Sequence, residues 1–144
     1  MFSKACEYGI KATLYIAKQT NLGSRCSVKG IANAINSPEA FTAKVLQSLA
    51  KNNIITSIKG ANGGYVIDIE KQQHTQLIQI VYAIDGDKIY KGCGLGLEEC
   101  NENKPCPIHD EYNSVRSNLK NMLENTSIEN LALGLAEGLT FLKV

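Results

Sequence analysis

The segment from Ser27 to Ile69 constrains the fold of this chain more than any other stretch of the sequence. Ser27 can cap a short helix, VKGIANAI, whose apolar residues recur at helical spacing. Ser37 is the candidate N-cap of a second helix, PEAFTAKVLQSLAKN, and Pro38 takes its first position, where a missing N–H costs nothing. Two short helices joined by a tight turn form a helix-turn-helix. The residues of the second helix predicted to face the core are Phe41, Val45, Leu46 and Leu49.

A β-hairpin is predicted directly after the second helix. Ile54–Ile58 and Tyr65–Ile69 favour strands, and KGANGG between them favours a turn. Helix, turn, helix and hairpin in this order make a winged helix. The predicted fold class is mostly α with a small β-hairpin: a winged helix-turn-helix DNA-binding domain over residues 1–70, opened by a helix over residues 4–19, plus a long dimerisation helix.

The remainder of the chain is predicted to contain a connecting helix, a cysteine-rich loop and the helices that form a dimer. Residues 71–86 hold a connecting helix over 75–84, capped by Thr75, and residues 87–107 form a cysteine-rich loop. Residues 108–144 hold a long helix and a last helix that Thr126 and Glu129 would begin as a capping box. Apolar residues recur along the long helix like the seam of a coiled coil. The stripe could pack back on the chain's own domain, but a homodimer interface is favoured, because helix-turn-helix proteins usually read two-fold symmetric sites. The seam residues are Ile108, Tyr112, Val115, Leu119 and Met122.

The charge distribution favours a polyanionic partner for the first half of the chain. The net charge is only +1 over 144 residues, but eight basic and two acidic residues through Ile67 give +6 there and leave −5 for the rest. Gln47 on the second helix of the pair suits adenine, Lys44 suits guanine or a phosphate, and Lys59 on the wing suits a phosphate or the minor groove. The candidate contacts to double-stranded DNA are Ser37, Glu39, Ala40, Thr42, Ala43, Lys44, Gln47, Lys59, Gly60, Asn62, Gly63 and Tyr65.

Several classes of function are disfavoured. No stretch approaches the roughly 20 apolar residues of a membrane span, so we expect a soluble, cytoplasmic protein without a membrane partner. No Ser/His/Asp or P-loop pattern appears, and Cys106 with His109 lacks a visible orienting group. We therefore expect no enzymatic activity and no catalytic residues.

Three of the five cysteines and one of the two histidines gather in CGLGLEECNENKPCPIHDEY. The spacing of Cys93, Cys100 and Cys106 contains no C-x-x-C knuckle, which disfavours a structural zinc finger, and three cysteines in a cytosolic protein disfavour a disulfide framework. A thiol switch remains an alternative: lysines in the loop would lower the pKa of its thiols, but the acidic residues there would oppose that effect. Iron–sulfur ligation by the three thiolates, with His109 as fourth ligand, fits well.

The sequence resembles the IscR/NsrR family of bacterial winged-helix repressors, also called the Rrf-two family. The resemblance rests on EYGIKATLYIA, on SVKGIANAINSPEAFTAKVLQSLAKNNIITSIKGANGGY, and on a wing similar to the family's R-G-x-x-G-G-Y, with Lys59 in place of the arginine. It implies a homodimer on an inverted-repeat operator and an iron–sulfur cluster, [2Fe–2S] rather than [4Fe–4S], on the three cysteines. His109 matches the IscR-type fourth ligand, and Glu7 matches the NsrR-type ligand that the partner subunit supplies.

Two hypotheses about sensing follow. In the first, the cluster senses redox state, nitric oxide or iron–sulfur status, and its gain or loss reshapes the loop at the base of the dimer helix. The spacing of the two winged helices on the operator would change with it. In the second, a winged-helix repressor without a cluster senses through thiol chemistry, a partner protein or a small ligand.

Overall fold

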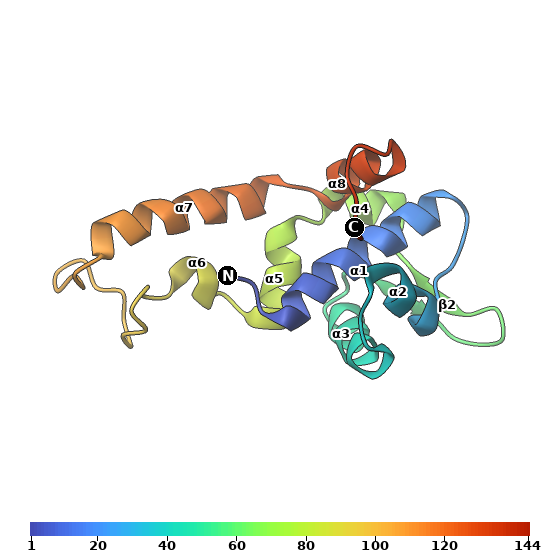
Figure 1. The fold of residues 1–144 in the computed structure, drawn as a ribbon, viewed down its shortest axis with the longest axis horizontal. Coiled ribbons are helices and arrows are strands. Elements are labelled where there is room, and N and C mark those ends of the chain that lie inside the picture. Colours follow the sequence, from blue (N-terminus) through green and yellow to red (C-terminus); the bar gives the residue numbers. More distant parts are fainter.

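The computed structural model describes residues 1–144 and shows a winged-helix body from which one long helix projects (Figure 1). None of its helices combines the length and the apolarity that crossing a membrane requires. In chain order the elements are α1 Lys4–Asn21, α2 Val28–Ile35, α3 Glu39–Lys51, β1 Thr56–Ile58, β2 Gly64–Val66, α4 Ile69–His74, α5 Leu77–Asp85, α6 Lys88–Lys91, α7 His109–Asn125 and α8 Ile128–Ala136.

The winged helix forms as predicted. The Ser27 hydroxyl accepts a hydrogen bond from the Gly30 N–H at 3.0 Å and so begins α2. Asn36 ends α2 in the left-handed region, with φ 54°, a conformation that asparagine tolerates and that lets the chain turn sharply into α3. β1 and β2 pair in antiparallel register, with Thr56 opposite Val66.

α1 is the central helix of the body and packs against α2, α3, α5 and α8. Its approach to α5 is close: a Cβ added to Gly9 would lie 2.2 Å from Cδ1 of Ile84, so a larger residue would require the Ile84 side chain to move. Thr13 is buried beside Gly9 and donates its hydroxyl proton to the Gly9 carbonyl at 2.8 Å. Burial of apolar residues from these helices forms one contiguous core.

The connecting segment differs from the prediction. Ile69 does not end a strand but begins α4, and Thr75 does not cap α5 but closes α4, where its hydroxyl donates to the Lys71 carbonyl at 2.6 Å. α5 begins after Gln76, whose N–H donates to the Gln79 side chain at 2.7 Å. α6 was not predicted. A single helical turn buries too few residues to leave a periodic pattern in the sequence.

α7 runs out from the body and carries the cysteine loop at its far end (Figure 1). Leu123 is its one fully buried residue. The N-cap of α8 is one residue later than predicted: Ser127, not Thr126, accepts from the Asn130 N–H at 3.2 Å, because Thr126 instead donates to the Met122 carbonyl. Backbone hydrogen bonds from Leu77 to Thr126 and from Ile128 to Thr75 tie the α7–α8 corner to the α4–α5 corner.

Candidate nucleic-acid interface and cysteine loop

The outer face of α3 is the candidate base-reading surface. Glu39, Ala40, Lys44 and Gln47 are exposed, as predicted, and Ala43 is half-buried. Thr42 was predicted to face outward, and this is wrong: it is 0% exposed. Its hydroxyl bonds to the Ser37 hydroxyl and donates to the Pro38 carbonyl, so its polar atom is satisfied inside the protein and cannot reach a base.

The structure places Phe41, predicted to face the core, at the edge of it. The residue is 38% exposed, and its ring meets that of Tyr8 edge-on with centroids 5.7 Å apart. The two errors concern adjacent residues in the first turn of α3; further along the helix Val45, Leu46 and Leu49 are buried, as predicted. Ser37 itself bonds to Thr42 rather than to a backbone N–H of α3, and Pro38 takes the N-cap position.

The wing presents Lys59 and Asn62 to solvent beside small residues. Gly60 has φ 105°, and a Cβ on Gly63 would lie 2.2 Å from the Ile58 carbonyl oxygen, so the turn requires glycine at both positions. Arg25 lies under the wing and donates to the Asn62 carbonyl at 2.6 Å. In the sequence Arg25 is visible only as part of the basic first half of the chain. Its position before a β-bridge to Tyr65 could not be inferred from local pattern.

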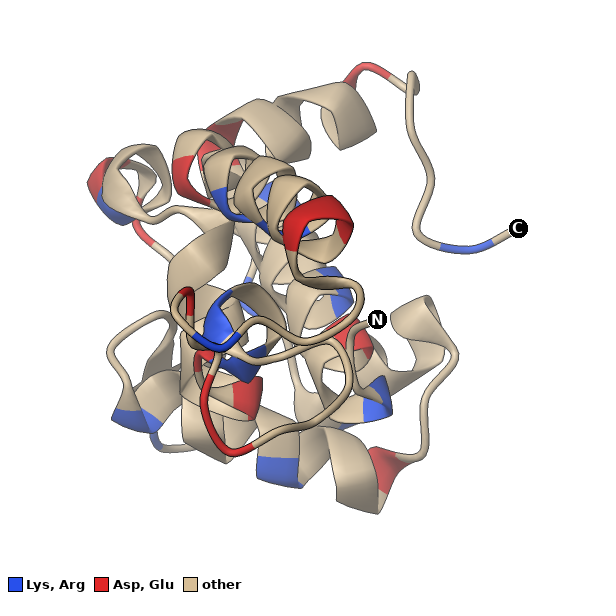
Figure 2. Cartoon of the chain, turned by 90° about the vertical axis from the view of Figure 1, so that its left-hand side faces the viewer, with Lys and Arg blue, Asp and Glu red and all other residues tan.

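The charges separate along the molecule. Lys29, Lys44, Lys59 and Arg25 are all exposed on the winged helix, and none has a carboxylate within 4.0 Å. The opposite end is more acidic. Figure 2 looks toward that end and shows acidic segments on the cysteine loop and at the start of α7. A duplex therefore meets attraction at the winged helix and not at the loop.

The cysteine loop brings its four candidate ligands together as two pairs. The Cys100 sulfur lies 3.5 Å from Nδ1 of His109, the first residue of α7. The Cys93 and Cys106 thiols lie close enough for each to shift the other's pKa. All three cysteines and His109 are half-buried, so reagents can reach them.

The two thiols of the second pair are electrostatically different. Backbone N–H groups at Leu95 and Leu97 point at the Cys93 sulfur and lower its pKa. The Ile108 N–H acts to lower the pKa of Cys106, but desolvation and the neighbouring Cys93 outweigh it, and the pKa of Cys106 is raised overall. Cys93 is therefore the readier thiolate and the better nucleophile at neutral pH.

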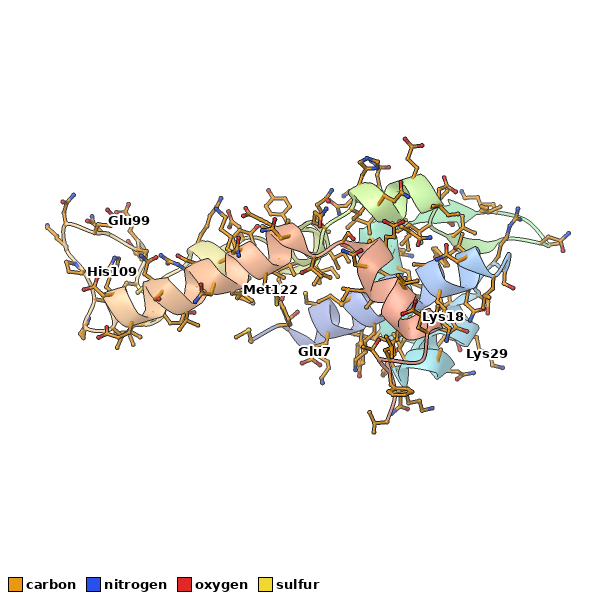
Figure 3. The ribbon with its side chains drawn as sticks, turned by 90° about the horizontal axis from the view of Figure 1, so that it is seen from above. Glu7, Lys18, Lys29, Glu99, His109 and Met122 are labelled. Atoms are coloured by element: carbon orange, nitrogen blue, oxygen red, sulfur yellow. The ribbon has the colours of Figure 1, made fainter.

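The donor set suits an iron–sulfur cluster by its chemistry, since three thiols and an imidazole are ligands that such clusters take. In the geometry described here no three His, Cys, Asp or Glu side chains are arranged to hold a metal ion. Cys100 also acts to raise the pKa of Cys106, so the two pairs are neighbours, and binding would require the loop to rearrange. Glu7 lies in the winged-helix body, well away from His109 at the far end of α7 (Figure 3), so it can approach a cysteine loop only from another subunit.

Most of the predicted seam is exposed in a single chain. Val115 is 56% and Met122 45% exposed, whereas Leu119 is half-buried against the core. Tyr112 is half-buried, and its ring lies against Gly94 of its own loop. An apolar cavity of about 580 Å³ opens beside the seam, between the N-terminus, α6 and α7.

The two remaining cysteines are structural. Cys6 and Cys26 are buried in the core. Burial, with Asp85 nearby, raises the pKa of Cys6 to about 12, and burial raises that of Cys26 to about 11. Both stay protonated at neutral pH, which keeps them out of thiolate chemistry.

The model of the Rrf2 family, described as iron-dependent transcriptional regulators, matches residues 2–133. The chain belongs to the Rrf2 family. The resemblance inferred from the wing and the first helix is thereby confirmed. Rrf2 proteins are transcriptional regulators rather than enzymes, and membership of the family implies that this chain binds DNA.

Two related transcriptional regulators are similar to this chain over most of its length. A putative HTH-type transcriptional regulator of Aquifex aeolicus (strain VF5) is 29% identical over 91% of this chain and 90% of its own length. CymR of Bacillus subtilis, the global cysteine regulator, is 27% identical over 87% of this chain and 84% of its own length.

Solved structures share the fold. That of CymR of B. subtilis has a TM-score of 0.75, with 23% identity, and covers 92% of this chain and 96% of its own. IscR of T. potens has a TM-score of 0.73, with 17% identity, and covers 97% and 91% of the two chains. An oxidised form of CymR of Staphylococcus aureus has a TM-score of 0.71, with 22% identity, and covers 92% and 95%.

Proposed function

We propose that this Rrf2 protein is a homodimeric, cytoplasmic repressor whose affinity for an inverted-repeat operator depends on the state of its cysteine loop. One observation carries the proposal: three cysteines and His109 converge where α7 begins, so any reaction of the loop acts on the helix that bears the exposed seam.

Each winged helix would read one half-site. α3 offers Lys44 and Gln47 to the major groove, and Lys59 on the wing offers a cation to the backbone. Two copies related by a twofold axis would place two α3 helices about one DNA turn, ~34 Å, apart. A change in the angle between the two α7 helices would alter that distance.

The dimer would form along α7. Val115 and Met122 have apolar side chains that the single chain leaves in water, and Leu119 continues the same stripe. Burying the exposed part of this stripe against a second copy would remove apolar surface from water, while Leu123 and the buried part of Leu119 stay packed on the body. Sedimentation of Val115→Asp tests this, since a charge in the seam should give monomers.

An iron–sulfur cluster would be held by Cys93, Cys100, Cys106 and His109, with Glu7 of the partner subunit as the rival to His109. A bound cluster supplies a group that responds to electrons, oxygen or nitric oxide. In the chain itself, backbone N–H groups lower the pKa of the Cys93 thiol, and His109 lies beside Cys100 at 3.5 Å. We propose [2Fe–2S] rather than [4Fe–4S], as in the expectation from the sequence; the three cysteines and one non-cysteine ligand supply the four ligands that such a cluster takes.

Thiol sensing without a cluster is the second candidate. The unequal pKa values of Cys93 and Cys106 favour attack by one on an oxidised partner, and related CymR structures include an oxidised form. In this version oxidation of the pair, rather than loss of a cluster, would reshape the loop.

Anaerobic purification, with measurement of visible absorption, iron and acid-labile sulfide, separates the two. The cluster version predicts colour, iron and sulfide in the wild type. All should be lost in Cys106→Ser and kept in Cys26→Ala, a substitution outside the loop. A colourless protein that stays free of iron after anaerobic reconstitution would leave only the thiol version.

A further inference from the structure

Residues of α7 contact the start of the cysteine loop at two points, one on each side of Cys93, which we call the first and second grip. Nη1 of Arg116 donates to the carbonyl oxygens of Lys91 at 2.9 Å and of Gly92 at 2.6 Å. The residue after Cys93, Gly94, lies against the ring of Tyr112. Tyr112 and Arg116 are four residues apart and so share one face of α7.

The first grip is specific in geometry. The other guanidinium nitrogen of Arg116 donates to the Asn113 side chain at 2.8 Å, which orients the fork toward the loop. Charged donors make the stronger class of hydrogen bond, and two carbonyls on one nitrogen fix both its direction and its distance. A lysine ammonium lacks the planar fork and cannot also hold Asn113 in this way.

The second grip leaves no room for a side chain. A Cβ on Gly94 would lie 2.8 Å from Cγ of Tyr112 and 2.9 Å from each of its Cδ atoms, closer than real Cβ contacts come. The Gly94 backbone therefore rests directly on the aromatic ring. Since Cys93 lies between the two grips, it cannot shift without displacing Arg116, Tyr112 or α7 itself.

We propose that Arg116 and Tyr112 form a bracket that couples the position of Cys93 to α7, so that they are the positioning residues through which the loop acts on the dimer helix. The proposal rests on the proposed function only in taking the loop as the sensor. Its test needs neither cluster nor DNA. Failure of the bracket would therefore appear separately from failure of iron binding or of operator binding.

Hydrogen exchange followed by mass spectrometry tests the first grip. Arg116→Met keeps an apolar stem of similar length and removes the donors. We expect the amides of residues 94–97 to exchange about tenfold faster, the factor that corresponds to losing one or two ordinary hydrogen bonds. Lys120→Met, one turn further along, removes only an exposed pair with Glu124 and should leave that rate unchanged. Equal behaviour of the two variants would refute the grip.

A double substitution tests the second grip. Gly94→Ala should accelerate exchange of the same amides in the wild-type background. It should have no further effect in a Tyr112→Ala background, because the methyl group then occupies the space that the ring left. Effects that simply add would show that Gly94 and Tyr112 do not act on each other.

The coupling itself is tested with a protein that keeps Cys93 but carries Cys100→Ser and Cys106→Ser. Labelling Cys93 with N-ethylmaleimide should change amide exchange over residues 110–118 of α7. The same label should leave those amides unchanged once Arg116→Met is added, a result that a purely structural role of Arg116 does not produce. An unchanged α7 in the first protein, or an equal change in both, would overturn the proposal.

Discussion

Leu123→Ala should loosen α7 from the winged-helix body. Leu123 is 0% exposed and is the one residue of α7 fully inside the core, whereas its neighbour Met122 is 45% exposed. The two adjacent residues therefore have separate tasks: Leu123 holds α7 to its own chain, and Met122 is free to meet a second one.

The magnitude follows from burial. Truncating a fully buried leucine removes its transfer free energy and leaves a cavity, which costs about 2–5 kcal/mol in the free energy of unfolding. Met122 is 45% exposed, so Met122→Ala removes only part of a buried side chain, and its cost within one chain should be clearly smaller than that of Leu123→Ala. In the proposed seam, however, Met122→Ala should raise the dissociation constant of the dimer.

Urea unfolding followed by circular dichroism measures the first effect, at a protein concentration where sedimentation shows monomers. The concentration matters because dimerisation adds to apparent stability. Leu123→Ala should lower the midpoint with little change in slope. If Met122→Ala destabilised the monomer as much as Leu123→Ala, the assignment of the two faces of α7 would be wrong.

Three further outcomes are expected. Lys59→Ala should weaken DNA binding across sequences and reduce the slope of log K against log salt by about 0.9, the value for one phosphate contact. The control Lys71→Ala, outside the predicted DNA contacts, should leave the slope unchanged, and an unchanged slope for Lys59→Ala would exclude that contact. Iodoacetamide at pH 7 should modify Cys93 before Cys106, because the pKa of Cys93 is lowered and that of Cys106 raised; peptide mapping in the reverse order would contradict the geometry. The free energy of unfolding should fall as the pH rises above about 9.

The pH effect comes from the two buried thiols. The pKa of Cys6 is raised to about 12 and that of Cys26 to about 11, from 9.0 when exposed. The folded protein thus keeps both protons while the unfolded chain loses them, so stability is complete below pH 9 and is lost as pH rises toward 11 and 12. Each thiol contributes about 1.4 kcal/mol per pH unit in that window. Melting temperatures under reducing conditions should fall less steeply for a Cys6→Ala, Cys26→Ala variant; equal slopes would show that burial does not shift these groups.

The winged helix could be predicted because its signals are local. Ser27 caps α2, asparagine tolerates the left-handed turn at Asn36, and apolar spacing marks the buried faces. Thr42, in the first turn of α3, was assigned to the wrong face for a physical reason. A threonine looks like a surface residue, yet Thr42 satisfies its hydroxyl with Pro38 and can be buried at little cost.

The features that the sequence did not predict depend on the way the chain folds, including contacts between segments far apart in the sequence. Thr75 and Thr126 look like helix caps in sequence, but each bonds back into the helix before it. Nothing near Arg116 indicates that it reaches Lys91, and nothing near Gly94 indicates the ring of Tyr112. The grouping of cysteines was visible in the sequence, whereas their arrangement as two pairs required the fold.

The most direct test compares the operator affinity of the anaerobically reconstituted protein with that of the same protein after removal of iron and sulfide, by fluorescence anisotropy at one salt concentration. We predict that the two dissociation constants differ by about tenfold or more, within the usual range of allosteric coupling. They should coincide when Cys93, Cys100 and Cys106 are all serine. Equal affinities in the two states of the wild-type protein, and again after its thiols are oxidised, would contradict the proposal that the cysteine loop controls DNA binding.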